Sequence, residues 1–338
     1  MGFNPIKTNY EIFVLRSEGN KYNLGKLVTS CTWREMENDY VCRATITMAN
    51  VKTSLGCWTE HITPLGSRIF IFANGQQVFC GTVWNHRYRS EKSSETIEVT
   101  ANDWMIYLSQ SKDSAYFGAG ALTIDVCEQT CQRWGIDVRY QYFPYNHGKL
   151  VFKNKSIMDQ LSEVCTECQD KNNGRKFIMQ FESDMALYIR GQGYNDTVYV
   201  LTGGELGTRS LISVELESSL DNLVTKVNVL GKADDEGRES VEASVEGDTS
   251  FGVLQEQIYR DNDKSIEETT AEAQGILDKK GKPEHAFSIT CPDIPFVRKG
   301  HRIHCVFSAE INDYFYVLSV THNVSSRTMD LKMEKAVK

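Results

Sequence analysis

The sequence lacks several features that would assign it to a familiar class of protein. None of its apolar runs approaches the roughly 18 residues that a membrane-spanning helix needs, and no segment is of low complexity. The first residues, Met1-Gly-Phe-Asn-Pro-Ile-Lys, contain no apolar segment typical of a signal peptide. We therefore expect a chain that is made and folded in a cytoplasm and does not insert into a membrane.

Recognisable catalytic motifs are missing as well. The chain contains no Gly-x-Ser-x-Gly, no His-Glu-x-x-His, no phosphate-binding glycine loop and no dinucleotide fingerprint. A pair of catalytic carboxylates cannot be selected among 45 acidic residues without a structure. From the sequence we predict a protein that is not an enzyme and binds no cofactor.

An excess of positive charge is also absent. The net charge is -8, which argues against stable binding to nucleic acid or to an anionic membrane. Apolar residues make up 41% and charged residues 24% of the chain, as in ordinary ordered domains. A length of 338 residues predicts two or three domains, and ten cysteines fit reduced, buried thiols.

What the chain does contain is a weak repeat between its two ends. Segment 66–83 begins Gly-Ser-Arg-Ile-Phe-Ile-Phe, and segment 300–320 begins Gly-His-Arg-Ile-His-Cys-Val. Each continues through a polar turn into an apolar strand and then into a further alternating strand. Matching the first glycines relates position 66 to position 300, whereas matching the apolar strands relates Val83 to Val320, which predicts three extra residues in the second turn. We interpret the repeat as a duplicated β unit.

The spacing of strands, turns and helices predicts three domains. We expect a first small β-barrel over 1–110, an α+β domain over 111–208 and a second, related β-barrel over 209–338. A helix is expected near 265–280 within the last domain. The fold class is therefore mainly β with an α+β insert, in which two related barrels are separated by the insert.

Short local signals support this division. Asn74-Gly75 separates two apolar strands and supplies the positive φ of a tight hairpin turn. Ser156 precedes a helical pattern with Asp159 three residues later, and Ser265-Ile-Glu-Glu268 is a complete capping box. The charged stretch 232–239 has the composition of a mobile loop.

Four cysteines are the strongest candidates for a metal site. Cys165-Thr-Glu-Cys168 has the spacing of half a zinc or redox site, and Cys127 and Cys131 offer two further thiolates. The same four residues also lie on the apolar faces of two predicted helices, where cysteine acts as a small hydrophobic side chain. We favour the second interpretation and predict no metal site.

Two other groups of side chains have a functional and a simpler interpretation. His301 and His304 point to opposite faces of a predicted strand and do not converge on a metal. The aromatic segment Tyr140-Gln-Tyr-Phe-Pro-Tyr145, with Asn102-Asp103-Trp104, offers a stacking surface for carbohydrate. Such aromatic residues are more often part of a core or of a subunit interface.

The order of these parts resembles a known family, the baseplate hub proteins of contractile phage tails and phage-like bacteriocins. This is the late control protein D group, which includes the amino-terminal half of type VI spike proteins; the strongest similarity is to hubs of prophages from Gram-positive bacteria. The resemblance spans almost the whole chain and rests on three segments. They are the hairpin 66–83 followed by Ile97-Glu-Val-Thr-Ala-Asn-Asp-Trp-Met-Ile-Tyr-Leu108, Phe-x-Asn-x-Ser-x-x-Asp-x-Leu at 152–161, and Pro-Phe-x-x-x-Gly-x-x-Ile at 295–303.

The resemblance implies a structural role and a set of partners. Three chains with two barrels each would form a pseudo-sixfold ring that joins a sixfold tail tube to a threefold central spike and lines the channel. The implied partners are two further copies of the chain, the tail tube protein, the central spike, the baseplate wedge proteins and the tape measure. The implied location is the tail of a phage or phage-like particle, after synthesis in a bacterial cytoplasm.

Two alternatives remain open at this point. Some relatives carry a lysozyme or a spike on the same chain; because this sequence ends at Lys338, we expect either activity to belong to a separate protein. A tail-associated cell-wall hydrolase would need paired carboxylates or a metal in a cleft. A module that binds cell-surface carbohydrate would use Tyr142 and Tyr145.

Overall fold

The chain is mainly β, with 48% of its residues in strands and 16% in helices, and this confirms the predicted fold class. The computed structural model describes residues 7–53, 56–91, 94–172, 174–203, 212–233, 237–261, 264–307 and 311–336. They form two compact units, one of residues 1–214 with 288–338 and one of residues 215–287. No helix among the described residues is long and apolar enough to cross a membrane.

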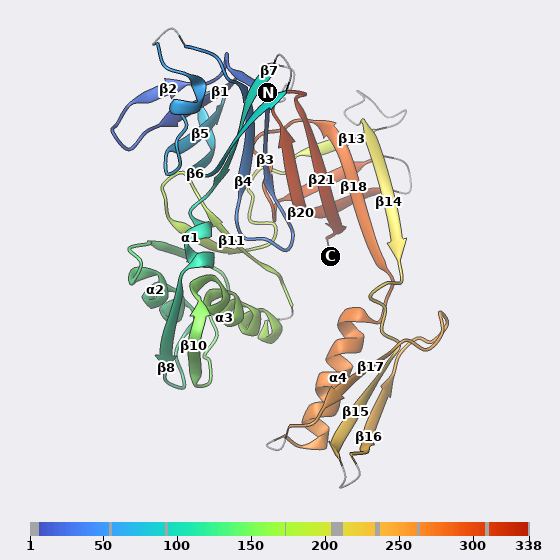
Figure 1. Ribbon diagram of the computed structural model, residues 1–338. Helices are drawn as coiled ribbons and strands as arrows, with labels where there is room; N and C mark the ends of the chain where they lie inside the picture. The colour runs from blue at the N-terminus through green and yellow to red at the C-terminus, as the bar shows by residue number, and fades with distance from the viewer. Residues whose placement is uncertain are drawn as a thin grey trace. The chain divides into compact units, whose positions relative to one another are not determined.

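The amino-terminal part of the larger unit consists of antiparallel strands (Figure 1). Its elements are β1 (Tyr10–Leu15), β2 (Lys21–Asn23), β3 (Val28–Glu35), β4 (Arg43–Ala49), the short 3-10 helix η2 (Thr59–His61), β5 (Arg68–Ala73), β6 (Gln76–Glu91) and β7 (Ser94–Asn102). Alternate side chains of β3 and β4 are buried, among them Cys31, Trp33, Ala44 and Ile46. This period of two places one face of the sheet in the core.

An α+β part follows in the same unit. Its elements are α1 (Met105–Gln110), β8 (Lys112–Phe117), α2 (Thr123–Gln132), β9 (Val138–Gln141), β10 (Leu150–Ser156), α3 (Ile157–Lys171), β11 (Phe177–Phe181), β12 (Leu187–Gly191) and β13 (Val200–Thr202). The predicted cap is present, since the Ser156 hydroxyl accepts from the Asp159 backbone N–H at 3.0 Å. Strand β8 pairs with β10, while β9, β11 and β12 form a three-stranded sheet.

The carboxyl-terminal elements include a second set of sheet strands. They are β14 (Ser213–Ser219), β15 (Lys226–Ala233), β16 (Glu239–Glu246), β17 (Gln255–Tyr259), α4 (Ile266–Lys280), β18 (Glu284–Pro292), β19 (Arg302–Val306), β20 (Asn312–Asn323) and β21 (Thr328–Lys335). The predicted helix near 265–280 is therefore α4. The charged stretch 232–239 links β15 to β16, and residues 234–236 of it lie outside the described residues.

The smaller unit has a core of its own. Strands β15, β16 and β17 form its sheet in the order β16-β15-β17, and α4 supplies Ala273 and Leu277 to a core with Val224, Val227 and Val229. The capping box at the start of α4 is complete. The Ser265 hydroxyl accepts from the Glu268 N–H at 3.1 Å, and the Glu268 carboxylate accepts from the Ser265 N–H at 2.8 Å.

Strands from both ends of the chain join in a single 13-stranded sheet. Its order is β14-β18-β21-β20-β3-β4-β7-β6-β5-β1-β2, with β19 paired to β20 and β13 paired to β19. Within the described residues the sheet contains no closed barrel. The expected barrels are thus two parts of one open sheet, and the boundaries at residues 110 and 208 stay predictions.

The sheet contains the same strand order twice. The amino-terminal repeat, β3-β4-β7-β6-β5, has the order of the carboxyl-terminal repeat, β14-β18-β21-β20-β19. The registers also agree, because Arg68 lies opposite Thr82 in the first hairpin and Arg302 lies opposite Tyr316 in the second. The shift in numbering that relates Arg68 to Arg302 also relates Thr82 to Tyr316. The duplication inferred from sequence is therefore confirmed at the level of strand order and register.

Backbone details repeat at the same shift and correct one expectation. Gly66 donates to the Val83 carbonyl at 3.0 Å, and Gly300 donates to the Val317 carbonyl at 2.7 Å. The two glycines have φ of +82° and +84°, the left-handed region that glycine adopts without strain. The equivalent of Val83 is thus Val317 and not Val320. The match of Val83 with Val320 was wrong, because apolar strand residues of similar type were matched out of register. The second turn is nevertheless three residues longer, as predicted, since five residues separate β19 from β20 and two separate β5 from β6.

Candidate assembly site at the junction of the two repeats

The two repeats are joined edge to edge by β20 and β3. Strand β20 has 12 residues, and a bulge at Leu318 divides it. Its first half pairs with β19, and its second half pairs with β3, so that Val320 lies opposite Glu35 and Asn323 lies opposite Thr32. Because a bulge increases the local twist of a strand, one strand can contribute to both repeats.

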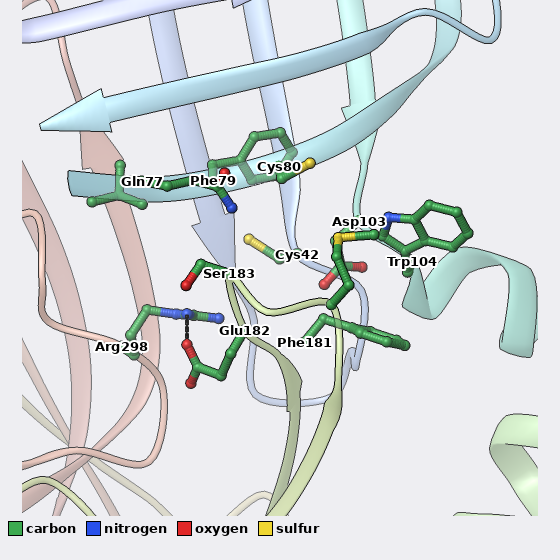
Figure 2. A pocket seen from close by; sticks show the side chains of 12 residues that line it. Cys42, Gln77, Phe79, Cys80, Asp103, Trp104, Phe181, Glu182, Ser183 and Arg298 are labelled. Atoms are coloured by element: carbon green, nitrogen blue, oxygen red, sulfur yellow. Dashed lines mark ion pairs between the residues drawn. The ribbon is translucent and has the colours of Figure 1, made fainter. Parts of the chain in front are cut away.

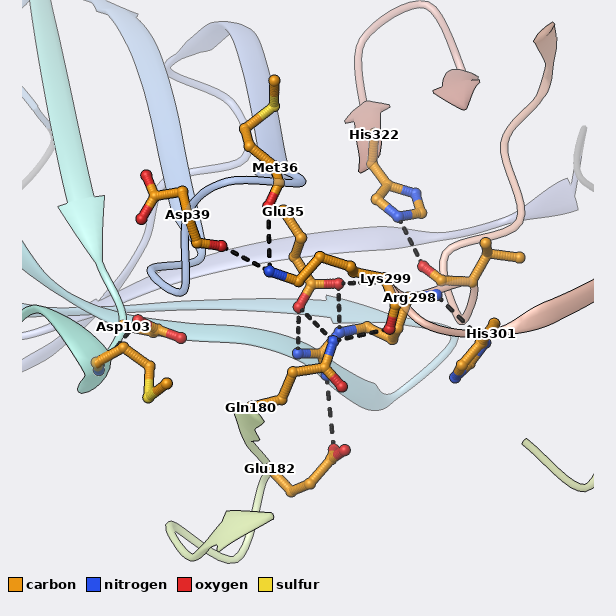
Figure 3. A network of polar contacts seen from close by, with 12 residues as sticks. Glu35, Met36, Asp39, Asp103, Gln180, Glu182, Arg298, Lys299, His301 and His322 are labelled. Atoms are coloured by element: carbon orange, nitrogen blue, oxygen red, sulfur yellow. Dashed lines mark hydrogen bonds and ion pairs between the residues drawn. The ribbon is translucent and has the colours of Figure 1, made fainter. Parts of the chain in front are cut away.

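A buried ion pair lies directly beside this strand pair (Figure 3). The Arg298 guanidinium donates through Nε at 2.9 Å and through Nη2 at 2.6 Å to the two carboxylate oxygens of Glu35. The Lys299 backbone N–H donates to the same carboxylate at 2.9 Å. Glu35 ends β3, whereas Arg298 and Lys299 precede β19. This two-pronged contact is the strong form of an arginine–carboxylate pair.

The ion pair sets the charge state of Glu35. Burial by itself would raise the pKa of this carboxyl group, but the charge and hydrogen bonds of Arg298 and the Lys299 N–H outweigh burial and hold it at about 2. The carboxylate is therefore ionised throughout the physiological pH range. Glu35 is a permanent negative charge inside the protein, and its partners must stay in place.

Lys299 closes the turn that follows β3. Its ammonium group donates to the carbonyl oxygens of Met36 at 3.1 Å and Asp39 at 2.6 Å. Burial lowers the pKa of Lys299, although nearby Glu35 opposes that effect. The side chain thus satisfies backbone acceptors of one repeat from the loop of the other.

The α+β part is connected to the same network. Gln180 of β11 donates to Glu35 at 3.0 Å and to the Lys299 carbonyl at 3.1 Å, and the Tyr194 hydroxyl donates to Gln180 at 2.6 Å. Glu182 forms an ion pair with Arg298 at 3.5 Å. One buried network therefore holds together both repeats and the α+β part of the larger unit (Figure 3).

A second cluster lies on the buried face of the junction. The His322 ring stacks on Trp33 with a centroid distance of 3.8 Å. Its Nδ1 faces the Asp293 carboxylate at 2.6 Å, and its Nε2 faces the Val297 carbonyl at 3.0 Å. The Tyr10 hydroxyl of β1 donates to the other Asp293 oxygen. Burial and the charge of Asp293 raise the pKa of Tyr10, so the hydroxyl stays protonated.

A small cavity of about 40 Å³ lies near the ion pair and contains the side chains that most resemble a reactive group (Figure 2). Among its lining residues are Cys42, Asp103, Glu182 and Arg298. Burial raises the pKa of Asp103 to about 8. However, the Asp103 carboxylate accepts from the N–H of Met105, the first residue of α1, at 3.1 Å, while Glu182 is paired with Arg298. The cavity is far below the roughly 300 Å³ of a small-molecule site.

The four candidate cysteines lie in the helical core. Cys127, Cys131, Cys165 and Cys168 are all buried, and α2 and α3, which carry them, pack together. The Cys168 thiol donates to the Phe143 carbonyl at 2.9 Å, and burial raises the pKa of Cys131 to about 12. Within the part of the chain that the structure describes, no three His, Cys, Asp or Glu side chains are grouped in a way that could hold a metal ion.

The remaining candidates do not converge either. The Tyr140 hydroxyl donates to the Phe143 carbonyl at 2.6 Å, and the Tyr142 hydroxyl donates to the Arg175 carbonyl. Both rings pack against the core of the α+β part. His301 is buried, whereas His304 stacks on Tyr314 at the surface of β20, with a centroid distance of 4.7 Å.

Sequence reasoning missed the junction residues. Glu35, Arg298 and Lys299 belong to no motif, and 263 residues separate Glu35 from Arg298. The one available signal is position, because Glu35 continues the buried alternation of Cys31 and Trp33 along β3. A charged residue on the buried face of a strand needs a partner of opposite charge.

Comparisons with known proteins agree on the fold. A family model described as YQBQ-like matches residues 31–334. A tail protein from Neisseria meningitidis MC58 superposes with a TM-score of 0.72 at 13% identity over 97% of both chains. The 43 kDa tail protein of prophage MuSo2 from Shewanella oneidensis gives 0.72 at 14% identity, over 96% of this chain and 98% of the other.

A third similar structure comes from a secretion system. The E. coli c3393 protein, described as a component of the type VI secretion system with similarity to the T4 tail proteins gp27 and gp5, gives a TM-score of 0.56 at 10% identity, over 92% of this chain and 74% of the other. A search of curated protein sequences finds no match. The resemblance to tail and type VI hub proteins expected from the sequence is thus confirmed as a shared fold.

Proposed function

Since the chain belongs to the YQBQ-like family and has the fold of phage tail proteins, we propose that it is the structural hub of a contractile-tail baseplate. In this role three copies form a symmetry adaptor between the sixfold tail tube and the threefold central spike, and they line the channel. The protein catalyses no reaction. Its working surfaces are the edges of the sheet and the faces that meet the neighbouring tail components.

The observation that carries this proposal is the duplicated strand order. A chain with two related β units, β3-β4-β7-β6-β5 and β14-β18-β21-β20-β19, presents six related units when three copies assemble around an axis. Such a ring has nearly sixfold symmetry toward the tube and true threefold symmetry toward the spike. A single unduplicated unit would need a second protein to make this change of symmetry.

The proposal also specifies partners and location. The tail tube protein, the central spike, the baseplate wedge proteins and the tape measure contact the hub, and the particle is a phage or a phage-like device assembled in a bacterial cytoplasm. Clusters of reactive groups do not compete with this role, because Asp103 and Glu182 beside the small cavity are engaged in a helix start and an ion pair.

Native mass spectrometry of the purified full chain tests the stoichiometry, and electron microscopy of tails that contain the chain tests its position. We expect three copies per particle, in a ring between tube and spike. A hub that occurs in six copies, or a chain located in the tail fibres, would contradict the proposal. A turbidity assay on purified cell walls tests the enzyme alternative, and clearing of the suspension would replace the structural role by a hydrolytic one.

A further inference from the structure

We propose that β14 of one copy pairs with the second half of β6 of a neighbouring copy, as β3 pairs with β20 within the chain. We call residues 85–91 of β6, which follow the bulge at Trp84, the β6 extension. This inference rests on the proposed trimeric hub and names the surface through which its copies join. It follows from the internal repeat. Within one chain β3 and β20 are paired, whereas their equivalents in the other repeat, β14 and β6, are not paired with each other over the residues that the structure describes.

The first half is the β6 extension. The shift that relates Gly66 to Gly300 makes residues 86–89 of β6 equivalent to residues 320–323 of β20, the segment that pairs with β3. In the amino-terminal repeat the extension pairs with β7 on one side. On its other side no strand among the described residues pairs with it. The position that β3 fills in one repeat is therefore open in the other.

The second half is the outer edge of β14. Strand β3 pairs with β4 and β20, whereas β14, its equivalent, pairs with β18 and ends the sheet in the described part of the chain. Apolar side chains along this strand are exposed, among them Val214 and Leu216. Since an exposed edge strand with apolar side chains invites pairing with another chain, this edge has the properties of a contact surface.

Equivalent residues of β20 and the β6 extension differ in burial, as expected if the extension lacks the neighbouring strand that β20 has. His322 is 0% exposed, because it stacks on Trp33 of the paired strand. Its equivalent on the β6 extension, Tyr88, is 46% exposed. Both residues lie opposite an inward-facing residue of the next strand, Met329 for His322 and Ile97 for Tyr88. A strand added beside the extension would cover the Tyr88 ring.

The two edges carry opposite net charge, because the β6 extension has two arginines and one glutamate (Glu91) and β14 has two glutamates and no basic residue. The β6 extension carries His86, Arg87 and Arg89, and β14 carries Glu215 and Glu217. Both arginines also pair with Glu98 of β7, at 3.3 and 4.0 Å, which holds them along the edge. In the register derived below, Glu217 lies opposite His86 and Glu215 opposite Tyr88, whereas Arg87 and Arg89 point to the other face of the sheet. The opposite charges of the two edges therefore attract the copies toward each other but do not form direct Arg–Glu pairs across the strands. Each copy has one edge of each kind, so contact between copies is head to tail, the arrangement from which a closed ring is built when the rotation between copies closes.

The repeat also predicts the register of the new pair. The Asn50 N–H donates to the Glu95 carbonyl and the Asp293 N–H to the Arg327 carbonyl, both at 2.9 Å, and each of these residues directly follows its strand, β4 or β18. Thr47 and Thr290 lie three residues before Asn50 and Asp293, so these two threonines are equivalent as well.

The partners of these two threonines then relate β3 to β14. Ser30 lies opposite Thr47, and Ile212 donates to the Thr290 carbonyl at 2.8 Å. Val214 is thus the equivalent of Thr32. Because Thr32 lies opposite Asn323, Val214 should lie opposite Arg89 of the neighbouring copy.

Disulfide formation between two singly substituted chains tests this register. Chains with Arg89→Cys and chains with Val214→Cys are mixed and oxidised, and a covalent dimer is expected from the mixture but from neither variant alone. The two single variants are also the controls for the ten native cysteines. A chain with Thr32→Cys and Asn323→Cys is the positive control, because these residues are paired within one chain.

Hydrogen exchange provides a second measurement that does not depend on substitutions. On assembly, amides of residues 85–91 and 213–216 should exchange at least tenfold more slowly, while those of β2, at the other end of the sheet, remain unchanged. A trimer without the cross-link and without this protection overturns the strand pairing and leaves the hub intact. A chain that remains monomeric in native mass spectrometry and gives no cross-linked dimer overturns the hub and the pairing together.

Discussion

Replacing Glu35 with glutamine removes the negative charge on which the junction between the repeats depends. Arg298 would then keep its buried positive charge with Glu182, at 3.5 Å, as its remaining ion-pair partner in the described part of the chain. The pKa of Glu35 is held at about 2 against an ordinary value of 4.5, a difference that corresponds to about 3 kcal/mol of stability near neutral pH. Mutations that break a buried pair by removing one partner cost about 3–5 kcal/mol. We expect Glu35→Gln to destabilise the larger unit by that amount.

Glu37→Gln is the matched control. Glu37 lies two residues after Glu35 and also connects the repeats, through an ion pair with Lys332 at 2.7 Å. Its side chain is 32% exposed, and exposed pairs contribute about 1 kcal/mol or less. Urea unfolding followed by circular dichroism, with hydrogen exchange of the β3 and β20 amides to isolate the junction, should therefore separate the two variants by at least about 2 kcal/mol.

The pH dependence gives the result that would refute this reasoning. Because the folded-state pKa of Glu35 is depressed, its contribution is complete above pH 4.5 and is lost as the pH falls toward about 2. The difference between the wild type and Glu35→Gln should therefore shrink steadily over that range. If the difference stays constant down to about pH 2.5, or if Glu35→Gln costs no more than Glu37→Gln near neutral pH, the ion pair does not hold the repeats together.

Three further predictions concern single positions. Gly66→Ala and Gly300→Ala both place a β-carbon at positive φ, but only at position 300 would that atom come within 2.5 Å of Ile178. Thermal unfolding should therefore show a cost of about 1–2 kcal/mol for Gly66→Ala and a larger cost for Gly300→Ala. Asp103→Asn should leave stability near pH 4 unchanged and raise it near pH 8. The pKa of Asp103 is raised from 3.8 to about 8 in the folded protein, so the wild type loses stability as the pH rises through that range. Urea unfolding midpoints at the two pH values check this. Ser265→Ala should cost the smaller unit about 1 kcal/mol, measured by hydrogen exchange of the α4 amides.

The local elements were predictable because short-range signals determine them. Asn74 and Gly75 both have positive φ in the turn between β5 and β6, as the dipeptide indicated. The Ser265 capping box marked the start of α4 correctly. In such cases neighbouring residues satisfy one another, and no distant partner has to be known.

The junction could not be predicted because its partners are far apart in the chain. Glu35 and Arg298 are 263 residues apart, and neither belongs to a motif that would point to the other. The register error had a similar cause. Matching Val83 with Val320 relied on residue type alone, whereas the position of the bulges at Trp84 and Leu318, visible only in the strand pairing, fixes the alignment.

The two repeats differ most where each meets its neighbour. The shift that relates the two hairpins places Leu65 where the second repeat has Lys299, which satisfies the carbonyl groups of Met36 and Asp39 across the junction. Leu65 is 64% exposed and can form no such hydrogen bonds. The junction within the chain is therefore fixed by buried polar contacts that require one specific geometry. The junction proposed between chains consists of exposed apolar and charged strand edges. These edges can pair after each copy has folded. Such a difference is what a duplicated chain needs, because identical junctions would let the repeats pair within or between copies indiscriminately.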